Sequence, residues 1–175
     1  MSSTEPEVDE AAFVHPTAAL VGNVRIGARV YVGPHASIRA DEPGPDGTVA
    51  PIVVEPEANV QDGVVLHALG GSNVVVGRGA SVAHGAVVHG PCRVGAGSFI
   101  GFNSVVFDAE LGENVVIMHG ALVEGVNIPA GLYVPSMAAV RSDEDVHGLE
   151  KASESALAFA DKVRRTNVHL ARSKN

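Results

Sequence analysis

Aliphatic side chains recur every six residues along most of the chain, and this period is the strongest signal in the sequence. The repeating positions are Val14, Leu20, Ile26, Val32, Ile38, Val54, Val60, Leu66, Val76, Val82, Val88, Val94, Ile100, Val106, Leu111, Ile117, Val123, Ile128, Val134 and Val140. In most repeats a small or β-branched residue follows four positions later. Six residues match neither the period of a helix nor the spacing of a hairpin, but they suit a short strand and a corner, with both recurring side chains directed inward.

The period predicts an all-β solenoid, a parallel β-helix built from hexapeptide repeats. Three such strands close one coil of a triangular prism, so the repeating positions make about six to seven coils. Successive coils stack at the spacing of paired strands, roughly 4.8 Å. The period does not give the hand of the coil, although the general rule for parallel crossovers favours a right-handed one.

Two insertions interrupt the repeat, one rich in Pro and Gly at residues 41–50 and a shorter one within residues 68–73. After residue 140 the pattern changes: Ser142 with Asp145 resembles a capping box, and apolar residues recur at helical spacing as far as Leu170. We therefore expect a disordered acidic arm over residues 1–12, a β-helix domain over 13–141, and a C-terminal α-helix with a tail over 142–175.

Composition narrows the classes of partner. The chain has 175 residues, enough for one domain with a core, and a formal net charge of -8, which argues against nucleic acid or an anionic membrane as a partner. The single cysteine, Cys92, has no partner for an internal disulfide, and the first residues lack the pattern of a signal peptide. We expect a cytoplasmic location.

The repeat also places the histidines. His67 and His89 each follow an inward aliphatic residue and are one full coil apart, so they should share an outward-facing column, with Arg39 in the same column one coil earlier. The same count stacks His84 on Asp62, one prism face away from the other two histidines. Gln61 lies beside Asp62 in this register.

Two imidazoles stacked at about 4.8 Å can converge on a tetrahedral zinc ion. His84 cannot reach that ion within one chain, because it lies around a corner, but another copy could supply it, as in a three-fold ring closed by unlike faces. Solvated surface histidines are the alternative interpretation, and we prefer a surface or helix position for His15, His35, His119, His147 and His169. Cys92 falls in the inward column and is most simply a core residue.

These segments resemble the γ-class carbonic anhydrases, which are trimeric, left-handed β-helix metalloenzymes. The resemblance is carried by S-I-R-A-D-E (37–42), A-N-V-Q-D-G-V-V-L-H-A-L (58–69), S-V-A-H-G-A-V-V-H-G-P (81–91), S-F-I-G (98–101) and N-V-H-L-A (167–171). It spans nearly the whole chain, and it implies a left-handed coil and a homotrimer. The implied activity is that of a lyase, the reversible hydration of CO2 to bicarbonate by a metal-bound hydroxide at the trimer interfaces.

The resemblance also implies roles for individual residues. The metal, Zn2+ with Fe2+ or Co2+ as alternatives, would be bound by His67 and His89 of one subunit and His84 of the next. The other implied roles fall to Gln61 (hydrogen bond to the hydroxide), Asn167 (CO2 site), Glu42 (carboxylate near the metal), and Arg39 with Asp62 (ion pair across the interface).

One departure from the family pattern concerns proton export. Active members carry a longer acidic loop after the first ligand, with a glutamate as proton shuttle, whereas residues 68–73 here read A-L-G-G-S-N. Glu42 is the candidate replacement. Two alternatives stay open, a weakly active or inactive scaffold trimer, such as the γ-like domain that organises carboxysomes, and a hexapeptide acyltransferase.

Overall fold

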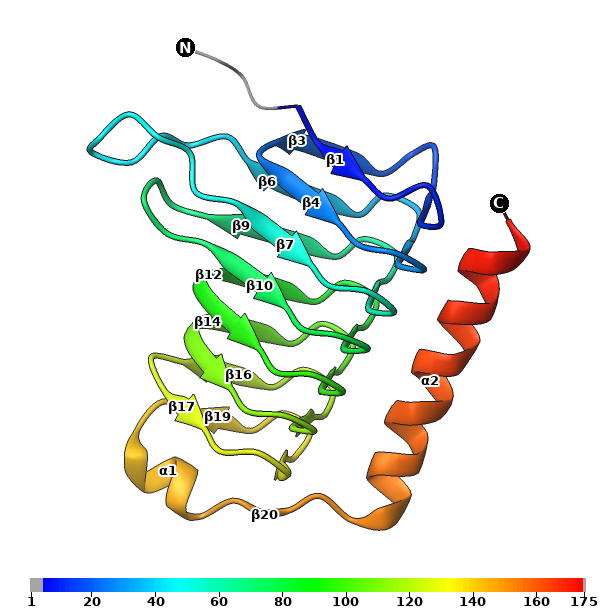
Figure 1. Cartoon of the computed structure of the whole chain (residues 1–175). Coiled ribbons are helices and arrows are strands. Elements are labelled where there is room, and N and C mark those ends of the chain that lie inside the picture. Colours follow the sequence, from blue (N-terminus) through cyan, green and yellow to red (C-terminus); the bar gives the residue numbers. More distant parts are fainter. Residues whose placement is uncertain (1–4, 175) are drawn as a thin grey trace.

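Short parallel strands stack into a prism of about seven coils, with a long helix along one side (Figure 1). The structure is a computed structural model and describes residues 5–174. Each coil contributes a strand to each of three faces, and strand pairs are parallel with in-register neighbours one coil apart. The hexapeptide period therefore predicted the architecture correctly.

Two of the faces are joined into one 12-stranded sheet, because β12 (Val87–Val94) and β14 (Val105–Leu111) run through the corner between them. One face holds β1 (Glu7–Val8), β4 (Val24–Ile26), β7 (Ile52–Val54), β10 (Val74–Val76) and β17 (Asn127–Ile128). The other holds β3 (Ala19–Gly22), β6 (Ser37–Ala40), β9 (Val65–Ala68), β16 (Leu122–Glu124) and β19 (Ala139–Val140).

The third face is an 8-stranded sheet. Its strands are β2 (Phe13–Val14), β5 (Tyr31–Val32), β8 (Asn59–Val60), β11 (Ser81–Val82), β13 (Phe99–Ile100), β15 (Val116–Ile117), β18 (Leu132–Val134) and β20 (Glu150–Lys151). The last pair, β18 and β20, is antiparallel.

The inward columns form one continuous apolar core. Leu66, Val88 and Ile100 are fully buried, as are most of the other repeating aliphatic residues. Cys92 is also buried in this core, as its register position predicts. Because each strand contributes only one or two inward side chains, the core is made of many small contacts repeated from coil to coil.

The N-terminal part of the chain differs from the prediction. Glu7 and Val8 form β1, which pairs with β4, and Ala12 is buried in the core. The expectation of a disordered arm over residues 1–12 is therefore wrong for residues 7–12, which complete the first coil. Residues 1–4 lie outside the described part of the chain.

The C-terminal part contains two helices where the pattern predicted one. In α1 (Asp143–His147) the Ser142 side chain accepts a hydrogen bond from the Asp145 amide, which confirms the predicted capping box. Strand β20 separates it from α2 (Glu154–Ser173), which runs back along the 8-stranded sheet (Figure 1). No helix in the described residues is long and apolar enough to cross a membrane.

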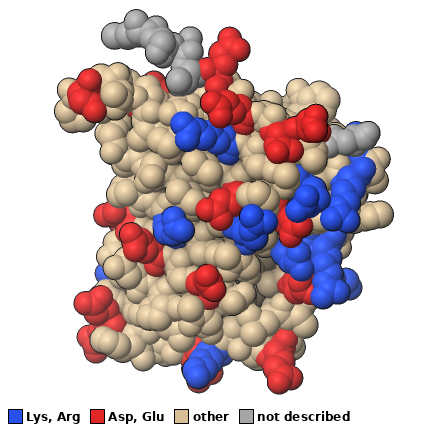
Figure 2. Space-filling model, in the orientation of Figure 1, with Lys and Arg blue, Asp and Glu red and all other residues tan. Residues whose placement is uncertain are grey.

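Helix α2 covers the outward face of the 8-stranded sheet with an apolar contact. Ala160 of α2 packs with Phe99, Val116 and Ala83, all of them buried. Because α2 lies on this sheet, the outward side chains of β8 and β11 are buried, on the face that also carries Gln61. Lys and Arg side chains gather along the side of the molecule where α2 lies (Figure 2).

The two insertions lie against each other at one edge of the prism (Figure 1). A Cβ atom added to Gly70 would lie 2.2 Å from the carbonyl oxygen of Pro43, so this close approach of two backbones requires glycine. The longer insertion begins directly after β6 and the shorter one directly after β9. Both insertions therefore start beside Arg39 and His67.

Candidate metal centre

His67 on β9 and His89 on β12 lie next to each other in the strand register, as predicted. Nδ1 of His67 is 3.1 Å from Nε2 of His89, and the ring centroids are 5.0 Å apart. The His67 side chain is only 14% exposed. The period of the sequence thus brings two ring nitrogens together on one face.

The second nitrogen of each ring also has a partner. Nδ1 of His89 lies 3.1 Å from the carbonyl oxygen of Gly90, to which it can donate in the tautomer that leaves the lone pair on Nε2. Nε2 of His67 lies 2.9 Å from Nη2 of Arg39 and 3.2 Å from Oε1 of Glu42. These partners fix the orientation of both rings.

His84 lies on a different part of the prism, two residues after the end of β11 in the 8-stranded sheet. Its Nδ1 lies 3.6 Å from Oδ2 of Asp62, which confirms the predicted stacking of these two residues, and its side chain is 54% exposed. The ring of His84 also stacks on Phe102, with centroids 5.4 Å apart. Within the described residues of one chain, no three His, Cys, Asp or Glu side chains are grouped so that they could hold a metal ion.

Gln61 is buried and belongs to a hydrogen-bonded chain of three side chains. Its Nε2 donates to Oδ1 of Asn59 at 2.9 Å, and Nδ2 of Asn59 donates to Oγ of Ser81 at 2.7 Å. All three residues are at most 4% exposed. In this arrangement Oε1 of Gln61 stays available as an acceptor.

Sequence reasoning missed Asn59 and Ser81. Both directly precede an inward valine, so the alternation of a strand places them outward, where a polar residue is ordinary. Only the position of α2 shows that they are buried. The signal available in the sequence was the pair of polar residues at equivalent positions of adjacent coils, Asn59 and Ser81.

The remaining predicted residues are placed separately. Arg39 pairs with Asp41 at 2.9 Å and with Glu42 at 3.4 Å in the same chain, and Asp62 approaches His84, so the chain itself does not join Arg39 to Asp62. Asn167 is buried on α2, where its amide donates to the carbonyl of Val163 at 2.9 Å. The ion pair between subunits and the contact of Asn167 with CO2 stay predictions.

The His67 and His89 pair fits two ligand positions of a zinc ion. Tetrahedral coordination at Zn–N distances of about 2.0–2.1 Å places two nitrogens about 3.3 Å apart, close to the 3.1 Å found here. Imidazole nitrogens also suit Fe2+ and Co2+. The donor set of one chain therefore supplies two ligands, and a third nitrogen must come from elsewhere.

Three curated proteins show what this chain is similar to. The carbonic anhydrase of Methanosarcina thermophila is 37% identical over 188 residues, a match covering 95% of this chain and 73% of that protein. The carboxysome assembly protein CcmM of Nostoc sp. is 41% identical over 172 residues, and this chain spans only 30% of its length. The carnitine operon protein CaiE of Escherichia coli is 40% identical over 113 residues, 64% of this chain and 54% of that protein.

Similar solved structures share the fold. A hexapeptide transferase family protein from Anaplasma phagocytophilum has a TM-score of 0.78 at 24% identity, covering 96% of this chain and 92% of that one. A putative acetyltransferase from Bacillus cereus has a TM-score of 0.83 at 21% identity, covering 97% and 91%. No family model matches. With its left-handed β-helix of hexapeptide repeats and its relationship to the Methanosarcina enzyme, the chain belongs to the γ-class carbonic anhydrase family.

Proposed function

We propose that this protein is a metal-dependent carbonic anhydrase, which interconverts CO2 and bicarbonate at sites shared between the subunits of a homotrimer. The observation that carries the proposal is the 3.1 Å approach of two ring nitrogens, His67 Nδ1 and His89 Nε2, on adjacent strands. His84 of a neighbouring subunit would be the third ligand. The 37% identity to a carbonic anhydrase supports this assignment.

A Zn2+ ion bound to three neutral histidines lowers the pKa of a water molecule to about 7 and so supplies hydroxide at neutral pH. The protein's own groups would orient the reaction. Because Nε2 of Gln61 already donates to Asn59, Oε1 of Gln61 would be the atom that accepts a hydrogen bond from a group on the metal and so orients that group. Asn167, with its amide buried on α2, is the candidate for contacting a CO2 oxygen.

Glu42 is the candidate group for moving the proton away. Its carboxylate lies 3.2 Å from His67 and is 37% exposed, so it touches both the site and the solvent. Residues 68–73 contain no carboxylate that could do this instead. In Glu42→Gln we expect slower turnover that a high concentration of imidazole buffer restores, whereas turnover independent of both the substitution and the buffer would remove this role from Glu42.

The decisive experiment is stopped-flow CO2 hydration by protein purified without oxygen, with metal content measured in the same sample. We expect His67→Ala and His84→Ala each to lose both metal and activity. His169→Ala, a change to an exposed residue of α2, is the matched control and should retain both. Hydration that survives the first two substitutions would exclude this function.

An assembly role is the second candidate, favoured by the 41% identity to CcmM over 93% of this chain. On that alternative the trimer forms and binds metal, but purified protein does not hydrate CO2. The likeness to acetyltransferase structures is below 25% identity and supports the fold alone. Transfer of an acyl group from acyl-CoA by purified protein would be needed to support that third alternative.

A further inference from the structure

Two phenylalanines repeat the arrangement of the histidines one coil further along the prism. Phe107 is the in-register neighbour of His89, and Phe102 stacks on His84, one coil further along the register that pairs Ser81 with Phe99. The ring centroids are 5.4 Å apart in both pairs. The pair Phe102 and Phe107 is separated by five residues, as His84 and His89 are.

Both phenylalanines expose apolar surface. Phe102 is 38% exposed and Phe107 is 36% exposed, among few large apolar side chains on the described surface. Phe102 is stacked between His84 and His119, the latter at 4.3 Å and nearly parallel. No ring contact joins Phe102 to Phe107 within the described chain, because they leave the prism on different faces.

A metal site shared between His89 of one subunit and His84 of the next fixes which residue of the neighbouring subunit lies beside Phe107. In a ring whose axis runs parallel to the prism, equivalent coils of all subunits lie at the same height. If His84 of one subunit reaches His89 of the next, then Phe102, one strand spacing of about 4.8 Å further along the same column, reaches Phe107.

The residues one coil before the histidines and one coil beyond the phenylalanines also form opposed pairs. One coil before the histidines, the same count places Asp62 of one subunit opposite His67 of the next, with Arg39 one coil further along the column of His67. One coil beyond the phenylalanines, His119 would face Glu124, the in-register neighbour of Phe107. Opposed columns that match in charge and in apolar character over successive rows are the property expected of two surfaces that meet.

We propose that Phe102 of one subunit packs against Phe107 of the next, so that an aromatic contact closes one side of each metal site. The proposal rests on the proposed shared site and adds residues to it. The contact excludes water on the side of the site nearer the C-terminal coils. CO2, water and the exported proton would then enter and leave on the other side, where Arg39 and Glu42 lie.

Chemical cross-linking tests whether the two side chains meet across subunits. Phe102→Cys and Phe107→Cys are made as separate proteins in a Cys92→Ser background, mixed, co-refolded, and treated with a short bis-maleimide, which spans a wider gap than a disulfide. We expect cross-linked dimers on a denaturing gel from the mixture only. Each protein alone carries one of the two positions and should give none. Equal cross-linking in all three samples, or in none of them, would overturn the proposal.

A double-mutant cycle on trimer dissociation is the second measurement, read by sedimentation over a range of concentrations. We expect Phe102→Ala and Phe107→Ala each to raise the dissociation midpoint, the protein concentration at which half of the trimer is dissociated, at least about tenfold. In the double variant the midpoint should exceed that of the more severe single variant by less than about threefold, because both substitutions remove the same contact. Phe159→Ala, a change to a similarly exposed ring on α2, should leave the midpoint unchanged. Additive effects of the two substitutions, or a wild-type protein that sediments as a monomer, would contradict the contact.

These readouts are independent of activity. Cross-linking of the mixture in a protein that neither binds metal nor hydrates CO2 would support the contact and reject the proposed function. Normal metal content and hydration without cross-linking would reject the contact and retain the function.

Discussion

At the scale of single residues, Asn59 is the side chain that holds the amide of Gln61 in its orientation. It accepts from Gln61 and donates to Ser81, and all three are buried beneath α2. Asn59→Leu keeps the branching of the side chain and removes both hydrogen bonds. We expect kcat/KM for CO2 hydration to fall about 10- to 100-fold at full metal content, because Gln61 loses the partner that holds its amide.

Ser81→Ala is the matched control for Asn59→Leu. It leaves one buried amide nitrogen of Asn59 without an acceptor, which should reduce the free energy of unfolding by about 1–3 kcal/mol, but the bond between Asn59 and Gln61 remains. Hydration rates within about threefold of the wild type are expected. Equal loss of activity in both variants would show that general loosening of the fold, and not the position of Gln61, is responsible.

Cys92 allows a prediction about reactivity and pH. Burial raises the pKa of its thiol to about 11, the amide of Ala109 opposes this, and Asp108 and Glu110 add to it. The native thiol should therefore stay unmodified by a disulfide reagent at pH 8 and react at once in guanidinium. Rapid reaction of the native protein would show that this part of the core opens.

The same pKa shift makes stability depend on pH. The pKa of Cys92 is higher in the folded protein than in the unfolded chain, so its contribution is complete below about pH 9 and is lost as the pH rises towards 11. The loss should reach about 2–3 kcal/mol, at 1.36 kcal/mol for each unit of pKa. In Cys92→Ala the free energy of unfolding should vary less over this range.

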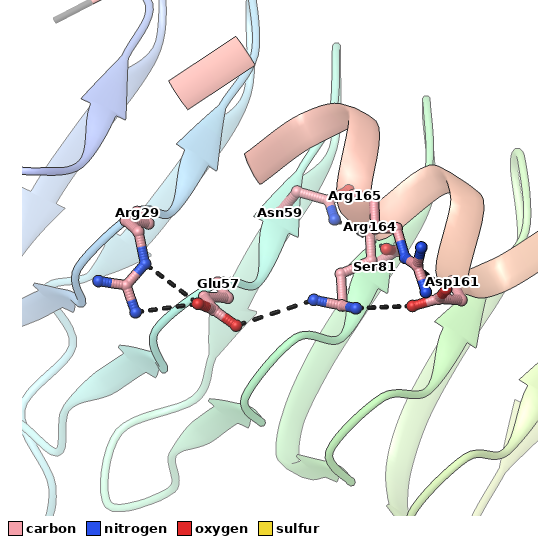
Figure 3. A network of polar contacts seen from close by, with 7 residues as sticks. All are labelled: Arg29, Glu57, Asn59, Ser81, Asp161, Arg164 and Arg165. Atoms are coloured by element: carbon pink, nitrogen blue, oxygen red, sulfur yellow. Dashed lines mark hydrogen bonds and ion pairs between the residues drawn. The ribbon is translucent and has the colours of Figure 1, made fainter. Parts of the chain in front are cut away.

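At the scale of elements, α2 is held by apolar packing and by an ion network. Arg29 and Arg164 both approach Glu57, at 2.9 and 3.8 Å, and Arg164 also pairs with Asp161 at 2.6 Å (Figure 3). These side chains are 26–39% exposed, so each pair should contribute less than about 1 kcal/mol. Phe99, fully buried beneath the helix, should contribute more.

Chemical unfolding of two variants tests this ranking. We expect Phe99→Ala to reduce the free energy of unfolding by about 3–5 kcal/mol and Arg164→Ala by about 1 kcal/mol or less. The Arg164 contribution should also disappear in acid, because hydrogen bonding to Arg164 lowers the pKa of Asp161, so this stability is present above the unfolded pKa and is lost as the pH falls below it. A larger effect of Arg164→Ala at neutral pH would mean that the ion network is what holds the helix.

The elements also show what the sequence could predict. A period of six fixes which residues become neighbours on adjacent coils, so the stacking of His67 with His89 and of His84 with Asp62 followed from counting. The first strand was missed although the repeat extends to it, because Val8 lies six residues before Val14 and Ala12 follows Val8 by four positions, and β1 pairs with β4 one coil away. The break between α1 and α2 was missed because β20 is set by its partner β18. The chain from Gln61 to Ser81 depends on where α2 packs, which is tertiary information.

At the scale of the whole molecule, the arrangement of ligands decides whether one chain can be active alone. His84 leaves a different part of the prism from His67 and His89, and the described chain contains no complete set of ligands. If each site lies between unlike faces of two subunits, then the ring has a direction, and every junction needs one intact face from each neighbour. Two inactive variants should then restore activity when they are combined.

Mixing His67→Ala with His84→Ala subunits tests this directly. Each variant alone has three defective junctions, but any mixed ring has one junction at which an intact His67 and His89 pair meets an intact His84. Random refolding at equal amounts makes about three quarters of the rings mixed, so metal content and CO2 hydration should both return to about a quarter of the wild-type level. A mixture of His67→Ala with His89→Ala, which damages the same face twice, should recover nothing. Recovery in neither mixture would show that the site is not shared between unlike faces of two subunits.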